Sequence, residues 1–195
     1  MSDISSKNLT IKLELQEDKK TPLSELMEHS FIPNTFRVFL LKYLTNRLLC
    51  NAQLHHINNG IDQSCLCCIN NGFLPPPKET IHHLLKYCPG TSALRNFMSN
   101  FFVVEALNQL EEDEICVGVN RFSQQKNMIC NIIILVFIKF TYQYRRTALI
   151  NDFNFLKDFI VDQLNEIFTL KKHLLRQVNS LINPNIQLES LDEVN

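Results

Sequence analysis

Four side chains of types that commonly bind metal ions lie in two closely spaced pairs within the stretch 65–88. Cys65 and Cys68 form a C-x2-C pair, and after fourteen intervening residues His83 and Cys88 form an H-x4-C pair. Structural zinc sites use thiolate and imidazole ligands of this kind, four to an ion in tetrahedral geometry. Four protein ligands leave no coordination position open for a reactive water. The spacing therefore predicts one structural Zn2+ ion and not a catalytic one.

The residues around the second pair resemble a known family pattern. The stretch 79–89 reads ETIHHLLKYCP, and Ala93-Leu94-Arg95 follows it. This is similar to the C-terminal zinc-binding (CCHC) module of reverse transcriptases from non-LTR (LINE-type) retrotransposons. That module has a C-x2-C pair, a loop containing E-T, then H-L-L-x2-C-P and a helix with a small-Leu-Arg element. An apolar and basic helix precedes it, and residues 36–49 fit that place. The resemblance is closest over residues 33–96.

Neighbouring residues offer alternatives for two of the four ligands. Cys67 competes with Cys68, but a C-x-C pair would make a tighter and less usual clasp than C-x2-C. His82 competes with His83, and His83 is the residue that keeps the family position directly before Leu-Leu. We therefore predict Cys65, Cys68, His83 and Cys88 as the ligands. The remaining cysteines, at positions 50, 116 and 130, are expected in the core.

The chain lacks the catalytic parts of the family that it resembles. A retrotransposon polymerase needs paired aspartates to hold two metal ions, and no Asp-Asp pair occurs in the sequence. Some relatives carry a nuclease after the zinc module, but its acid-x-Lys motif is not found in residues 105–195. No cysteine–histidine–acid arrangement indicates nucleophilic catalysis. We expect a protein that is not an enzyme.

In that family the module follows the polymerase and helps to grip template RNA or target DNA. The resemblance thus implies RNA or DNA as the partner of this chain. The residues that it implies for phosphate contact are Arg37, Lys42, Arg47, Lys86 and Arg95. Arg145 and Arg146, with two tyrosines nearby, could also contact nucleic acid, but we favour the interpretation that they form the polar end of a core helix.

The charge distribution agrees with a contact surface in the middle of the chain. The net charge is −1 overall, −2 for residues 1–33, +4 for residues 34–104 and −3 for residues 105–195. This basic excess is modest for a protein that binds duplex nucleic acid. An alternative function is therefore a zinc-stapled interaction or scaffold subunit that docks on a protein partner through the helices of residues 124–182.

The strongest apolar run, at residues 128–140, is shorter than a bilayer crossing and contains Asn131 and Lys139. We predict a buried central helix and no membrane association. The first twenty residues are polar and contain no apolar signal segment. Because the cysteines cluster at a metal-ligand spacing, we expect a reducing compartment, the nucleus or cytoplasm.

The apolar periodicity predicts a mainly α fold, a helical bundle with one structural zinc knuckle inserted between helices. The predicted helices are a short one from 21 to about 30, then 35–57, 79–87, 91 or 92 to about 110, 124–149 and 152–182. Two further stretches are read as a period-two strand signal, at 9–15, and a solvated acidic loop, at 111–114. The expected organisation is an N-terminal arm with a short helix (1–33), the basic helix and zinc module (34–104), a helical region (105–182) and a tail (183–195).

Overall fold

The computed structural model describes residues 20–101 and 110–168, with residues 174, 177–178 and 181–182. This part of the chain is mainly helical, which confirms the predicted fold class. The helices are η2 (Ser24–Glu28), α1 (Asn34–Leu44), α2 (Asn51–Ile57), α3 (Leu66–Asn70), η3 (His83–Tyr87), η4 (Pro89–Thr91), α4 (Ser92–Phe101), α5 (Glu112–Val117), α6 (Gln124–Tyr144), η5 (Ala148–Asn151) and α7 (Phe153–Phe168). The strand predicted at 9–15 lies outside the described residues.

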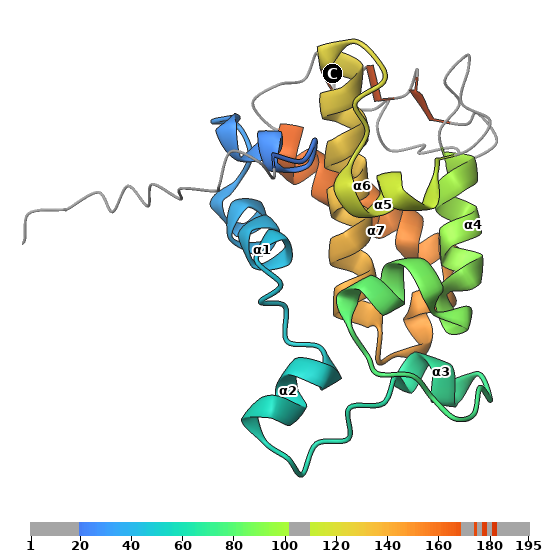
Figure 1. The fold of residues 1–195 in the computed structure, drawn as a ribbon. Helices are drawn as coiled ribbons and strands as arrows, with labels where there is room; N and C mark the ends of the chain where they lie inside the picture. The colour runs from blue at the N-terminus through green and yellow to red at the C-terminus, as the bar shows by residue number, and fades with distance from the viewer. Residues whose placement is uncertain (1–19, 102–109, 169–173, 175–176, 179–180, 183–195) are drawn as a thin grey trace, which may run out of the picture.

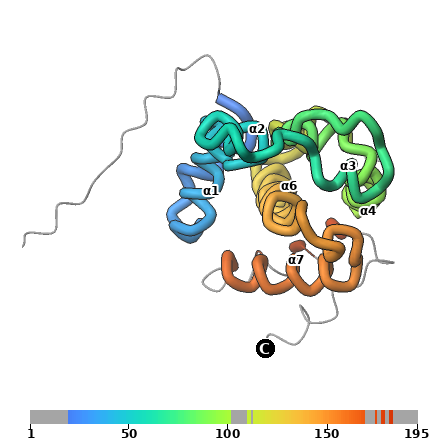
Figure 2. The backbone as a smooth tube through the Cα atoms, turned by 90° about the horizontal axis from the view of Figure 1, so that it is seen from below, coloured from blue at the N-terminus to red at the C-terminus, as the bar shows by residue number. Residues whose placement is uncertain are grey.

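Helix α6 is the centre of the fold. Twelve of its 21 residues are buried, and they lie on all sides of the helix. Figure 1 shows α6 between α1 on one side and α4 on the other, with α2 and α3 near its C-terminal end. In Figure 2 the helix is seen nearly end-on, with α7 on one side and the α2–α3 segment on the other. A helix that is apolar all round is stable in water only when neighbours cover it, as they do here.

Two polar residues in the apolar part of α6, Asn131 and Lys139, have partners inside the protein. Asn131 accepts a hydrogen bond from the Val119 backbone N–H (2.7 Å) and donates to the Val119 carbonyl (3.1 Å). The Lys139 ammonium lies 4.0 Å from the ring centroid of Phe36 and donates to the Gln163 side chain. Burial lowers the pKa of Lys139. These contacts place both polar side chains within the fold.

By length and composition, α6 is the one described helix that could cross a membrane, because it has 21 residues and its most apolar window has a mean hydropathy of 1.3. The prediction that this segment is too short to cross a bilayer, which was based on residues 128–140 alone, is therefore weakened. Core helices pass the same test, and 67% of that window is buried inside the protein. The burial supports the interpretation of α6 as a core helix.

The single helix predicted over residues 35–57 is wrong, since the chain forms two helices there. After α1, Asn46 adopts a positive φ of 53°, a left-handed conformation that asparagine tolerates better than most residues. Helix α2 then begins at Asn51, because Glu79 accepts the first two N–H groups of that helix. Its side chain bonds the N–H of Asn51 and its carbonyl bonds the N–H of Ala52, both at 3.1 Å.

Other boundaries also differ from the prediction. The acidic stretch 111–114 is not a loop but the start of α5, where Glu111 and Glu114 form a reciprocal capping box. Helix α6 ends at Tyr144, and residues up to 151 form a turn and the 3-10 helix η5. Helix α4 is described as far as Phe101, and α7 as far as Phe168; the predicted continuations lie largely outside the described residues.

Candidate metal centre

The four predicted ligands are brought together in the structure. The Cys68 sulfur lies 3.3 Å from His83 Nε2 and 3.5 Å from the Cys88 sulfur. The Cys65 sulfur lies 3.8 Å from the Cys88 sulfur, and all four ligand atoms lie within 4.8 Å of one another. All four side chains are buried. This cluster could hold a metal ion.

The separations fit a tetrahedral ion. Zinc–sulfur bonds of about 2.3 Å at tetrahedral angles place two sulfurs about 3.8 Å apart. The measured sulfur–sulfur separations of 3.5 and 3.8 Å are close to that value. Three thiolates and one imidazole would complete the coordination, so the donor set has the composition of a closed structural site.

The first ligand pair is positioned by α3 and by a short antiparallel pairing. Cys65 is the residue before the first turn of α3, and Cys68 lies in that helix. The Cys65 N–H donates to the Pro77 carbonyl, and the Glu79 N–H donates to the Gln63 carbonyl, both at 2.8 Å. These two bonds flank the bridge between residues 64 and 78. They close the base of the loop that leads from the first ligand pair to the second.

The second ligand pair lies on a widened helical turn. The Thr80 hydroxyl accepts a hydrogen bond from the His83 N–H (3.0 Å) and caps the start of this turn. The Cys88 N–H donates to the His83 carbonyl at 2.7 Å, an i→i+5 bond of the π type. This bond joins the backbones of the two ligands directly. We refer to residues 63–91, which contain all four ligands, as the knuckle.

The thiols influence one another's protonation. The hydrogen bond from the Cys65 thiol holds the pKa of Cys88 far below its usual value. The hydrogen bond to Cys88, together with burial, raises the pKa of Cys65. Burial also raises the pKa of Cys68 to about 11. A metal ion must therefore displace protons from the buried thiols when it binds.

Cys67 and His82, the two alternative ligands, lie outside the four-atom cluster. The Cys67 thiol is buried and faces Gly90, where an added Cβ would lie 2.6 Å from that sulfur. His82 is exposed, and its ring meets the ring of Tyr87 edge-on at 5.3 Å. Glycine at position 90 thus lets the loop after Cys88 pack closely against α3.

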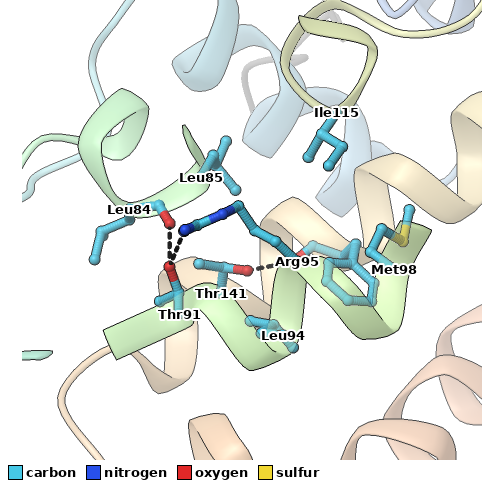
Figure 3. Close-up of a pocket in the computed structure, with 9 residues that line it drawn as sticks. Leu84, Leu85, Thr91, Leu94, Arg95, Met98, Ile115 and Thr141 are labelled. Carbon is cyan, nitrogen blue, oxygen red and sulfur yellow. Dashed lines mark hydrogen bonds between the residues drawn. The ribbon is translucent and has the colours of Figure 1, made fainter. Parts of the chain in front are cut away.

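Two of the residues predicted to contact phosphate form bonds to or from the knuckle. The Arg95 guanidinium donates to the Cys88 carbonyl (2.7 Å) and to the Thr91 hydroxyl (2.8 Å). Figure 3 shows this side chain extending from α4 toward Thr91, beside a small cavity lined mainly by apolar groups. Lys86 forms an ion pair with Asp113 of α5. Both basic residues are therefore engaged in bonds within the protein.

The remaining predicted contact residues lie on and after α1. Arg37 donates to the His29 carbonyl at 2.6 Å and is partly buried. Lys42 and Arg47 are exposed, and the Arg47 N–H donates to the Lys42 carbonyl. Of the five predicted contact residues, Lys42 and Arg47 are thus the two whose side chains are exposed, and a backbone hydrogen bond joins them.

One buried ion pair beside the candidate metal centre was missed by the sequence analysis. Glu79 is fully buried, and its carboxylate accepts a hydrogen bond from Arg145 Nε at 3.1 Å. The interpretation of Arg145 as the polar end of a core helix holds for its position, but the residue is buried and ion-paired. These two residues are 66 positions apart, so no local pattern signals the contact.

In comparisons with protein-family models, curated proteins and solved structures, the chain has no match.

Proposed function

We propose that the knuckle is a structural zinc site and that the chain is a non-catalytic nucleic-acid-binding module related to the C-terminal part of retrotransposon reverse transcriptases. The observation that carries the proposal is the buried cluster of Cys65, Cys68, His83 and Cys88 at separations suited to one ion. Zinc accepts this soft donor set without geometric strain. Stoichiometric zinc in protein purified without chelator, found by elemental analysis, is the expected result.

The resemblance is supported by the contacts that the residues of the family pattern make in the structure. Glu79 and Thr80, the E-T element, bond the start of α2 and the ligand turn. Leu84 and Leu85 lie within that turn and are buried. Arg95, the last residue of the small-Leu-Arg element, caps the Cys88 carbonyl. The pattern therefore consists of residues that hold the metal ligands in place.

For the nucleic-acid contact, the structure favours a smaller surface than the five predicted residues. Lys42 and Arg47 are exposed, as is Lys78 in the loop that leads to the second ligand pair. Arg37, Lys86 and Arg95 are bonded internally and add less to an external phosphate surface. Each phosphate contact releases condensed counterions, so binding through this surface should weaken as salt rises.

The test is fluorescence anisotropy with short RNA and DNA over a range of salt. The double variant Lys42→Gln and Arg47→Gln should lower the affinity. The slope of log K against log salt concentration should become shallower by about the release of two counterions. A matched double variant, Lys126→Gln and Lys157→Gln, removes the same charge from α6 and α7 and should bind as the wild type does. Equal affinity of both double variants would overturn this contact surface.

A second candidate function, a zinc-stapled protein-interaction subunit, is favoured by the apolar surface of the knuckle. Ile69, Phe73, Leu74 and Tyr87 are exposed, with 79% of Leu74 accessible to solvent. Exposed apolar groups of this size are a feature of surfaces that contact other proteins. Wild-type protein that binds neither RNA nor DNA at low salt would favour this candidate over the first.

A further inference from the structure

A buried ion pair links the knuckle to the central helix. Arg145 directly follows α6 and is 9% exposed, while Glu79 is fully buried. The guanidinium also donates to the Leu49 carbonyl (3.0 Å) and to the Tyr142 carbonyl, and it lies 4.2 Å from the Tyr142 ring centroid. Removing either partner of such a pair leaves an uncompensated charge away from water. The pair therefore fixes Glu79 firmly in place.

Glu79 in turn fixes both chain segments that lead to the proposed metal ligands. It lies four residues before His83, and its N–H bonds the carbonyl of Gln63, two residues before Cys65. Its carboxylate also bonds the N–H of Asn51, whose side-chain amide donates to the Ser64 carbonyl at 2.8 Å. The approaches to the two ligand pairs thus meet at Glu79, through its backbone N–H to Gln63 and, by way of Asn51, through its buried carboxylate.

We propose that Glu79 and Arg145 are positioning residues of the metal centre, which hold the two ligand pairs at metal-binding separation. Metal affinity then depends on Arg145, a residue that lies at the end of α6 and outside the knuckle. The inference rests on the proposed zinc site and adds the part of the fold that sets its affinity.

The physical reason is preorganisation. Without metal, no metal–ligand bond joins the two ligand pairs, and the short helical turns that carry them are not stable on their own, so the pairs can separate. The Glu79–Arg145 pair opposes that separation, because Glu79 lies on the approach to the second pair and is bonded to the approach to the first, directly at Gln63 and through Asn51 at Ser64. Without the ion pair, metal binding must also order the loop. Outer-shell residues that orient metal ligands typically change affinity by about 10- to 100-fold when they are replaced.

The experiment measures Zn2+ affinity of the full chain by competition with a chromophoric chelator. The variants are Arg145→Met, Glu79→Gln and the double variant. Glu79→Gln keeps the side-chain length and an acceptor for the Asn51 N–H. The control is Arg121→Met, which removes an arginine from a surface ion pair with Glu114. Melting temperatures with and without zinc, and the Co2+ spectrum at saturation, are measured on the same samples.

Each single variant should bind Zn2+ about 10-fold more weakly or worse, and the double variant should be no weaker than the weaker single variant. The Co2+ spectrum should remain tetrahedral, since the four ligands are unchanged. Arg121→Met should retain wild-type affinity. Arg145→Lys, which keeps the positive charge, should recover part of the affinity and serves as the measurement if Arg145→Met does not fold.

Two negative results have different meanings. If the wild type binds no stoichiometric zinc, the proposed zinc site itself fails. If the wild type binds zinc and the variants bind it within about twofold of Arg121→Met, the inference is wrong. In that case, equal losses of melting temperature with and without zinc would show that the pair only stabilises the fold.

Discussion

The knuckle and the central helix α6 are held together by different kinds of interaction. Helix α6 buries twelve of 21 residues, so apolar burial stabilises it from every side. The knuckle contains α3, a helix of five residues, and a ligand turn of similar length. Helices this short are not stable on their own. They depend on polar bonds, on the buried Glu79 and, as we propose, on a metal ion.

This difference implies that the two regions open with different free energies. A region held by burial unfolds with the whole domain, whereas a region held by a few polar bonds and an ion opens separately when one of them is removed. The comparison predicts that changes in α6 affect both regions, and that changes in the knuckle affect mainly the knuckle.

The largest effect is expected from Ile134→Asp, which places a carboxylate at a fully buried position of α6. A buried unpaired charge should cost several kcal/mol, which is comparable with the whole free energy of unfolding of an ordinary domain, about 5–15 kcal/mol. Circular dichroism should show loss of helix with and without zinc. A folded variant would contradict the central role of α6.

A smaller effect is expected from Cys68→Ser, which removes a ligand and should abolish stoichiometric zinc. Amide hydrogen exchange should rise in residues 63–91 and stay low in α6. Cys67→Ser is the control and should retain zinc, because its sulfur lies outside the four-atom cluster. If exchange rises equally in both regions, the knuckle and core are one cooperative unit.

The next effect is expected from Gly90→Ala. The added Cβ would lie 2.6 Å from the Cys67 carbonyl oxygen and from its sulfur, so the loop after Cys88 must move. Overpacking of this kind typically costs about 1–3 kcal/mol. Thermal unfolding should show the loss, and zinc affinity should fall with it. Gly72→Ser, at a position with no neighbour within 4 Å of the added Cβ, tests an open part of the knuckle, although its positive φ adds some strain of its own.

The smallest effect is expected from a change of pH, which should alter zinc affinity without altering the fold. Burial raises the pKa of Cys68 to about 11, so its thiol keeps its proton at neutral pH until metal displaces it. Protons compete with zinc, and affinity should therefore fall as pH falls, by about tenfold per pH unit for each proton displaced. Chelator competition between pH 6.5 and 8.5 checks the sign. Affinity that is independent of pH would show that the ligands are already deprotonated.

Local sequence patterns were enough to predict the mainly α fold and the buried cluster of four ligands. The ligands lie in two short-spaced pairs, so their types and spacing carry the signal without knowledge of the rest of the fold. The capping box at Glu111 and Glu114 also had a local signal, an acidic residue three positions after another, but the cluster of charges was read as a solvated loop.

Long-range contacts account for what the sequence could not predict. Helix α2 begins at Asn51 because Glu79 accepts its first N–H groups, and nothing near Asn51 in the sequence indicates this. Arg145 reaches Glu79 across 66 positions. Arg95 has the charge of a phosphate ligand, but the structure directs it to a backbone carbonyl in the knuckle. For Asn51 and Arg145 a polar partner far along the chain decides the role, and for Arg95 a backbone carbonyl seven residues away does so.

The closed base of the knuckle loop has a consequence for how this protein can be modified. The hydrogen bonds Cys65–Pro77 and Glu79–Gln63 fix the loop ends, while residues 69–75 are exposed. The entropy cost of closing a loop grows slowly with its length. Residues can therefore be inserted between Asn71 and Leu74, for example to carry a fluorescent tag, while the ligand pairs keep their separation. The same tolerance would let related chains differ in length at this position.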